Sequence, residues 1–449
     1  MAAQHQETIA AIATPPGRGG VGILRISGPR VRTLIDALIG HPLPPREARF
    51  TAFRDAGGQT LDQGLALFFK GPASYTGEDC LELQAHGNPL LLDRLLARLT
   101  ELGCRLARPG EFTERAFLNG KLDLAQAEAV ADLIEAGTET AVRAAQSSLC
   151  GDFSRKIAAL VDDCIRLRCQ VEAAIDFIDE DIDPLSLSGV GEGLWHLEET
   201  LLEILAISRQ GVLLREGMTL ILLGPPNAGK SSLLNILSGE DRAIVTEIPG
   251  TTRDLLRVRL DLGGVPVELI DTAGLRDHPA DAIEAEGIRR AQVALQSADG
   301  ALVVSDDSEP ESVGPLLTGL SESLPRLWIR NKIDLSGNPP DLEETPLGPS
   351  VRVSLKTREG LSMLESALGR LTGIRPQAEP PFLARRRHID ALERAHQALK
   401  EALTCRELGN TELVAEQLRL VQASLGEITG TFSSDDLLGE IFSSFCIGK

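Results

Sequence analysis

The sequence predicts a chain of mixed α/β and α architecture, in which an α+β domain precedes a helical domain that is interrupted by an inserted α/β domain. Residues 1–120 alternate strand-like apolar runs with Gly/Pro turns, as in ETIAAIATPPGRGGVGILRISGP. Residues 121–215 are rich in Ala, with the apolar spacing of three and four that is typical of helices. A β-α-β pattern occupies residues 216–378, and helical spacing returns in residues 379–449. We expect the two helical segments to reunite in space around the insertion.

Composition excludes several classes of protein. The hydrophobic content of 43% is sufficient for packed cores, and no stretch approaches the roughly 20 apolar residues of a membrane span. The start MAAQHQETIAAIATPPG lacks the positive segment of a signal peptide, and seven scattered cysteines form no C-x-x-C pair. We therefore expect a cytoplasmic protein without a transmembrane segment. A net charge of −20 argues against binding nucleic acid by bulk electrostatics.

A glycine pattern near the start imitates a dinucleotide-binding motif. Gly17, Gly19 and Gly22 satisfy G-x-G-x-x-G, but that motif has its dinucleotide meaning only where it opens a helix. Here VGILRIS follows, with the apolar spacing of a strand. We expect a Gly/Pro-rich turn that brings the backbone close to a neighbour.

The strongest motif is TLILLGPPNAGKSSLLNIL. Gly224, Gly229, Lys230 and Ser231 complete a P-loop, with an apolar strand before it and a helix after it. Such glycines let backbone N–H groups surround phosphate oxygens, helped by the helix N-terminus. Lys230 would supply positive charge for the β and γ phosphates, and Ser231 an oxygen for Mg²⁺. The motif predicts a nucleotide-binding site.

Later motifs select the base. VPVELIDTAG ends a predicted strand with Asp271, which can hold the water shell of the metal, and Gly274 can approach the γ-phosphate. LWIRNKID ends another strand with Asp334, whose carboxylate can accept both N–H groups of the guanine edge, which adenine does not supply. VSLKT fits a loop beside the base more weakly. The set predicts GTP, and hence a Ras-like P-loop GTPase domain.

The turn-rich segment TEIPGTTRD is interpreted as the first switch loop, with Thr252 as a second Mg²⁺ ligand. Leu275 stands where Ras-like GTPases place a Gln that orients water, so catalytic help must come from elsewhere. The residues expected to contact GTP are Asn227, Ala228, Gly229, Lys230, Ser231, Ser232, Thr246, Glu247, Ile248, Pro249, Gly250, Thr251, Thr252, Asp271, Thr272, Ala273, Gly274, Asn331, Lys332, Ile333, Asp334, Ser354, Leu355 and Lys356.

The order of motifs along nearly the whole chain resembles the MnmE (TrmE) family of tRNA-modification GTPases. The stretches are ATPPGRGGVGILRISG, PGEFTERAFLNGKLDLAQAEAVADLI, GPPNAGKSSLLN, PGTTRD, DTAGLR, NKID, FLARRRH and the terminal FSSFCIGK. The resemblance implies a folate-binding, dimer-forming N-terminal domain and a flavoprotein partner, MnmG, that brings FAD and uses NADH. Together they would add aminomethyl or carboxymethylaminomethyl groups to C5 of the wobble uridine of certain tRNAs. A tetrahydrofolate derivative, 5-formyl or 5,10-methylene, would supply the one-carbon unit.

The resemblance also implies catalytic help from K⁺. The expected K⁺ ligands are Asn227, Thr246, Ile248 and Thr251. A cation beside the bridging oxygen would stabilise developing negative charge much as an arginine finger does. The pattern E-x-x-G-I selects Glu284 as the residue that positions water, although it also has the interpretation of an exposed acid in a first helical turn.

The folate positions implied by the resemblance are Arg25, Glu82, Lys121 and Lys449. If Lys449 reaches this pocket, a flexible tail carries Cys446 beside the one-carbon donor. The Cys446 thiolate could then act as a nucleophile, or the side chain could pack as a small apolar anchor.

Two other functions remain open at this point. One is a regulatory GTPase of ribosome assembly without modification activity. The other is a folate-dependent one-carbon enzyme that acts on small molecules and is gated by GTP.

Overall fold

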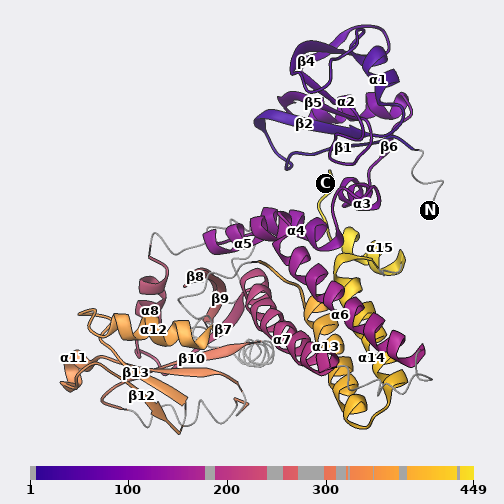
Figure 1. The fold of residues 1–449 in the computed structure, drawn as a ribbon. Helices are drawn as coiled ribbons and strands as arrows, with labels where there is room; N and C mark the ends of the chain where they lie inside the picture. The colour runs from indigo at the N-terminus through magenta and orange to yellow at the C-terminus, as the bar shows by residue number, and fades with distance from the viewer. Residues whose placement is uncertain are drawn as a thin grey trace, which may run out of the picture. The chain divides into compact units, whose positions relative to one another are not determined.

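The computed structural model describes residues 7–176, 188–239, 256–271, 298–309, 320–321, 324–346, 348–373, 382–431 and 435–448. Figure 1 shows the helices and strands of the chain, which divides by its internal contacts into two compact units. One comprises Met1–Ile134, Leu149–Leu197 and Arg394–Lys449, and the other Glu135–Ser148 and Glu198–Glu393. The mixed architecture predicted from the sequence is confirmed, whereas the boundaries at residues 120, 215 and 378 stay a prediction.

The N-terminal part contains a six-stranded sheet with the order β3-β4-β5-β2-β1-β6. All neighbouring strands are antiparallel except β1 and β6. The elements are β1 (Ile9–Ile12), β2 (Gly19–Ser27), α1 (Val31–Leu38), β3 (Arg49–Arg54), β4 (Thr60–Phe69), β5 (Cys80–Gly87), α2 (Pro89–Glu101), β6 (Arg105–Leu106) and α3 (Glu111–Leu118).

The two faces of this sheet have different coverings. Leu24 and Ile26 of β2 share one apolar core with residues of α1 and α2, including Leu34 and Leu95. Because successive side chains of a strand point to opposite faces, Arg25 lies on the other face. There, Ile9 and Ala11 of β1 pack with Phe112 of α3. The alternation of β2 therefore brings a charged side chain to the face that α3 covers.

The glycine pattern near the start lies only partly in the predicted turn: Gly17 is in a bend, whereas Gly19 and Gly22 belong to the strand that was predicted to follow. Gly19 begins β2, so the pattern opens a strand and not the helix that a dinucleotide-binding motif requires. A Cβ atom on Gly22 would lie 2.5 Å from the Leu92 side chain of α2, so a side chain at this position would collide with the helix. The glycine serves the close packing of a helix on a strand, which agrees with the predicted close approach.

The helical part includes α4 (Leu124–Glu135), α5 (Glu139–Leu149), α6 (Asp152–Asp176), α7 (Ser188–Glu216), α13 (Arg386–Glu407), α14 (Thr411–Thr429) and α15 (Asp435–Ser443). The Cys164 thiol of α6 donates to the Leu418 carbonyl of α14, and Gly193 of α7 lies against Leu167 of α6. These contacts confirm that segments from both sides of the insertion pack together. α15 joins α4 in a separate apolar cluster that contains Phe442 and Phe445.

The second unit contains a seven-stranded sheet with the order β12-β13-β11-β10-β7-β9-β8. The strands β9, β7, β10, β11 and β13 run parallel, and the edge strands β8 and β12 are antiparallel to their neighbours. The elements are β7 (Met218–Leu223), α8 (Lys230–Leu237), β8 (Leu256–Leu262), β9 (Val265–Asp271), β10 (Gly300–Asp306), β11 (Arg326–Asn331), α11 (Ile333–Ser336), β12 (Asp341–Thr345), β13 (Gly348–Arg352) and α12 (Leu361–Leu371). This arrangement is a Ras-like α/β fold.

The chain leaves and re-enters the helices around this sheet at neighbouring points. Arg386, at the start of α13, pairs with Glu216, at the end of α7, over 3.0 Å. A Cβ atom on Gly211 of α7 would lie 2.7 Å from the carbonyl of Phe382. The two ends of the inserted segment are therefore held side by side. In the described parts of the chain, no helix has both the length and the apolar character needed to cross a bilayer.

Candidate functional site

The turn between β7 and α8 has the geometry of a phosphate-binding loop. Gly224 has φ +155°, and a Cβ atom there would lie 2.3 Å from the Val304 carbonyl of β10. Gly229 has φ +107°, and its Cβ atom would lie 2.2 Å from the Asn331 amide nitrogen. Asn227 adopts φ +60° and is exposed. The glycines thus permit both the turn and the close approach of neighbouring strands.

The lysine of the loop is held at its centre. Lys230 begins α8 and is 8% exposed, and its ammonium donates to the carbonyls of Gly224 and Pro225 over 2.9 Å each. Ser231 and Ser232 follow in the first turn of α8 and are exposed. The loop therefore presents a fixed positive charge, and the helix N-terminus beside it exposed hydroxyls, which suits an anion with a bound metal.

The predicted polar residues gather at one edge of the sheet. Asp271 is the last residue of β9 and pairs in register with Leu222 of β7, directly before the loop. Asn331 ends β11 and pairs with Asp306, which ends β10. Because the carboxyl ends of parallel strands meet at the same edge, these residues surround the loop after β7. Ligands of open α/β sheets bind at such an edge.

Asn331 connects the phosphate loop to the loop after β13. Its amide nitrogen donates to the Ala228 carbonyl over 2.9 Å, and its amide oxygen accepts from the Leu355 N–H over 3.1 Å. Asn331 is 4% exposed, so both bonds lie in the interior. Its role in this structure is to join two loops.

The next two predicted residues are also held by neighbours. Lys332 adopts φ +69°, and its ammonium lies 2.9 Å from the Asp306 carboxylate. Asp334 accepts a hydrogen bond from the Ser354 hydroxyl over 2.7 Å. Burial favours the neutral acid of Asp306, but hydrogen bonds from Ser308 and the Lys332 charge hold its pKa below the usual range. Ile333 is buried, whereas Lys356 is exposed.

Asp307 was missed by the sequence reasoning. Its buried carboxylate accepts hydrogen bonds from Ser336 over 2.6 Å and Asn338 over 2.7 Å, and lies 2.8 Å from Arg330. Burial opposes ionisation, but these hydrogen bonds and the charges of Arg330 and Arg352 hold the pKa of Asp307 low. The carboxylate therefore fixes the segment after Asp334. Two consecutive Asp residues directly after an apolar strand are the signal in the sequence.

A second group of predicted residues meets on the N-terminal sheet. Arg25 of β2 and Glu82 of β5 are direct neighbours in register, and their side chains form an ion pair at 2.9 Å. The rings of Tyr75 and Phe112, which were not predicted, lie 5.4 Å and 5.9 Å from the Arg25 guanidinium carbon. Burial raises the pKa of the Tyr75 phenol. The group combines a carboxylate, a guanidinium and two aromatic rings.

The C-terminal tail reaches this group and is packed. The Gly448 carbonyl lies 3.4 Å from Arg25 Nη1, and a Cβ atom on Gly448 would lie 2.7 Å from the Ile12 carbonyl. Phe445 is 5% exposed, so the expectation of a flexible tail is not met over these residues. Cys446 is exposed, and its carbonyl accepts from the Gly110 N–H over 3.4 Å. Lys121 donates to the Pro72 carbonyl over 3.1 Å.

Several predicted site residues lie outside the described part of the chain. They are Thr246, Glu247, Ile248, Pro249, Gly250, Thr251, Thr252, Thr272, Ala273, Gly274, Glu284 and Lys449.

Comparisons with known proteins agree with these features. Family models named "MnmE helical domain" and "GTP-binding protein TrmE N-terminus" match residues 124–446 and 8–121. Two relatives named tRNA modification GTPase MnmE are each 53% identical. One, from Methylococcus capsulatus, aligns over 100% of both chains, and the other, from Chromohalobacter salexigens, over 99% of this chain and 98% of its own.

Among solved structures, the G domain of the T. maritima FeoB iron transporter is 27% identical and covers 34% of this chain and 98% of its own. Its TM-score of 0.27 is too low to carry an argument. The family models and the full-length relatives are decisive. The chain belongs to the MnmE family.

Proposed function

We propose that this chain is a tRNA modification GTPase, the activity in the name of its relatives, and that it acts with the flavoprotein MnmG, which brings FAD and uses NADH. The observation that carries the proposal is the full-length match to those relatives. It is supported by the structure, in which the P-loop and the residues predicted to contact guanine lie at the same edge of the sheet. The product would be an aminomethyl or carboxymethylaminomethyl group on C5 of the wobble uridine. The expected setting is the cytoplasm.

The GTP part of the proposal is supported by the chemistry of the sheet edge. Lys230 provides a positive charge that can pair with phosphate. The buried Asn331 holds the phosphate loop and the loop of Leu355 together by hydrogen bonds. Asp334, oriented by Ser354, has a carboxylate suited to the two N–H groups of guanine. The exposed hydroxyl of Ser231 and the Asp271 carboxylate offer the oxygen ligands that Mg²⁺ prefers.

We include K⁺ as a cofactor of hydrolysis and a homodimer as the working form. The exposed Asn227 lies in the phosphate loop with φ +60°, a conformation that Asn tolerates better than most residues. In the proposal its amide is one K⁺ ligand, beside Thr246, Ile248 and Thr251. Glu284 would position the attacking water.

The folate part rests on Arg25 and Glu82. A pterin ring is flat and has guanine-like N–H donors. The Glu82 carboxylate suits those donors, and the Tyr75 and Phe112 rings beside its partner Arg25 offer surfaces for a flat ring. The glutamate tail of folate would find positive charge at Lys121 and Lys449. A bound tetrahydrofolate derivative, 5-formyl or 5,10-methylene, would supply the one-carbon unit.

Cys446 is the proposed nucleophile of the modification. This choice between the two roles is supported by burial, because Phe445 is buried in an apolar cluster while Cys446 is exposed. Phe445 is thus the apolar anchor, and the Cys446 thiol is left accessible for chemistry.

The first prediction concerns the modification itself. Deleting the gene should remove the C5 side chain from the wobble uridine, because in the proposal the folate one-carbon unit reaches the uridine only through this enzyme. Mass spectrometry of digested tRNA measures the nucleoside. Wild type should restore it and Cys446→Ser should not, whereas Cys150→Ser, at another exposed cysteine, should restore it fully. An unchanged nucleoside in the deletion strain would contradict the proposal.

The second prediction concerns Asn331. Asn331→Ala leaves the Leu355 N–H and the Ala228 carbonyl without their partner, a loss of about 2 kcal/mol. Because GDP binding requires both loops to be placed, we expect this loss to weaken GDP affinity by up to roughly thirty-fold. Titration with a fluorescent GDP analogue measures the Kd. Asn235→Ala, at an exposed position of α8, is the control and should keep the wild-type Kd. Equal affinities for the two variants would show that the link made by Asn331 does not support nucleotide binding.

The third prediction concerns K⁺. GTP turnover should be roughly 10²-fold faster in KCl than in NaCl at equal ionic strength, the range that one preorganised donor or charge is worth at a developing oxyanion. In Asn227→Ala the two salts should give the same slow rate. Equal wild-type rates would remove K⁺ from the mechanism.

The fourth prediction concerns Glu82. Glu82→Ala should abolish binding of 5-formyltetrahydrofolate in calorimetry, because the pterin loses its acceptor and Arg25 loses its partner. GTP turnover should stay unchanged. Glu47→Ala, at an exposed carboxylate of the same unit, should bind as wild type does. Folate affinity retained by Glu82→Ala would refute the assignment.

A further inference from the structure

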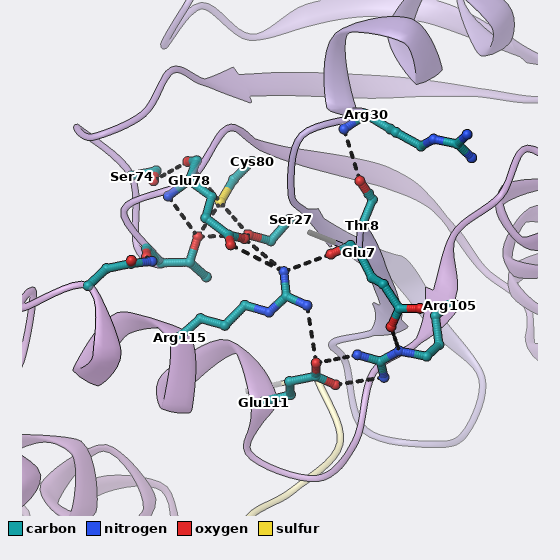
Figure 2. Close-up of polar contacts among 12 residues, drawn as sticks. Glu7, Thr8, Ser27, Arg30, Ser74, Glu78, Cys80, Arg105, Glu111 and Arg115 are labelled. Carbon is teal, nitrogen blue, oxygen red and sulfur yellow. Dashed lines mark hydrogen bonds and ion pairs between the residues drawn. The ribbon is translucent and has the colours of Figure 1, made fainter. Parts of the chain in front are cut away.

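Among the residues that the structure describes, Arg115 has the largest side chain that is fully buried. It lies on α3 and points toward Glu78 and Glu111 (Figure 2). A buried cation costs several kcal/mol unless carboxylates and hydrogen bonds compensate it. The residues around Arg115 must therefore supply carboxylates and hydrogen-bond acceptors to its guanidinium.

The partners of Arg115 come from separate segments of the chain. Nη1 donates to the Glu7 carbonyl, just before β1, over 2.9 Å, and to the Glu78 carboxylate over 3.0 Å. Nη2 donates to Glu111, one turn earlier on α3, over 3.1 Å. Glu78 belongs to the segment 70–79 between β4 and β5, and its carboxylate also accepts from Ser27 of β2 over 2.6 Å. One guanidinium thus joins α3, the sheet and this connecting segment.

Stability alone does not explain such a network. Replacing buried ion pairs by well-packed apolar residues often leaves stability unchanged or raises it. The best-supported role of buried ion pairs is therefore to specify one conformation of the chain segments that they join. A guanidinium suits this use because its donors form a rigid fork, while an ammonium is a point charge. Glu111 is 2% exposed, and although burial opposes ionisation, the bonds from Arg105 and from the Arg108 N–H hold its pKa low.

The segments that Arg115 joins also carry the walls of the Arg25 group. Segment 70–79 carries Tyr75, whose hydroxyl lies 2.9 Å from that of Thr113 on α3. α3 carries Phe112 and is preceded by Gly110, whose N–H donates to the Cys446 carbonyl. Asn119, at the other end of α3, donates to the Thr76 carbonyl over 2.7 Å. The fixed placement of segment 70–79 on α3 decides where both rings stand.

We propose that Arg115 is a positioning residue of the Arg25–Glu82 site, because it holds segment 70–79 on α3 so that Tyr75, Phe112 and the tail meet at Arg25. Arg115 acts through these groups and has no contact with ligand. The inference rests on the proposed folate function and adds a residue to that site.

The chain offers a specific probe, because Tyr75 is its single tyrosine. Full-length protein labelled with 3-fluorotyrosine gives one ¹⁹F resonance, which reports on the Tyr75 ring alone. Arg115→Lys keeps the charge and removes the fork, and Glu78→Gln removes one anionic partner. Arg105→Lys is the matched control, because Arg105 also pairs with Glu111, over 3.0 Å, but makes no bond to Glu78 that the structure records.

We expect Arg115→Lys and Glu78→Gln to move the resonance toward that of urea-unfolded protein. They should also raise the Kd of 5-formyltetrahydrofolate about tenfold, with GTP turnover unchanged. The control should match wild type in all three measurements. A residue that only added stability would leave the resonance of the folded protein in place. Should Arg115→Lys fail to fold, Glu78→Gln carries the same test.

An unmoved resonance, or a wild-type Kd despite a moved resonance, overturns the positioning role. If wild-type protein fails to bind the folate, the proposed folate function falls. The resonance then decides the positioning role by itself: movement in Arg115→Lys and not in Arg105→Lys supports it, and no movement overturns it.

Discussion

The architecture depends on one constraint: an inserted domain must return the chain to the place where it left. Here the constraint is met by direct contacts, with Glu216 at the end of α7 paired with Arg386 at the start of α13, and Gly211 packed on the carbonyl of Phe382. Because these ends are held together, α13 and α14 continue the helical part, and α14 packs on α6 from before the insertion. The tail can then reach the N-terminal sheet.

Close backbone packing also shapes the edge of the second sheet where the phosphate loop lies. Gly224 and Gly229 allow β10 and Asn331 to approach the phosphate loop more closely than any side chain would permit. Asn331 uses that proximity to join the loop to Leu355. The packing that makes the turn possible therefore also fixes the two sides of the site relative to each other.

The sequence predicted those features that depend on residues close together in the chain. The P-loop between a strand and a helix, the strand that contains VGILRIS and the insertion between helical segments are all visible in spacing and turn residues. What could not be predicted are pairings between distant side chains. Lys332 with Asp306, and Arg115 with Glu7, Glu78 and Glu111, arise only when strand order and helix placement are known. In the sequence, Arg115 is one of many arginines, and no periodicity marks it as buried.

In the C-terminal tail, neighbouring residues have different environments, some buried and one exposed. Phe442 and Phe445 bury their rings against α4, and Gly448 fits a backbone approach to Ile12 that a side chain would block. Between these fixed points Cys446 is held by its carbonyl while its thiol stays exposed. Anchors on both sides limit the positions available to Cys446 without burying it. In the proposed role of Cys446 as nucleophile this combination matters, because a thiol held near its target gains the proximity that a freely moving chain end would lose.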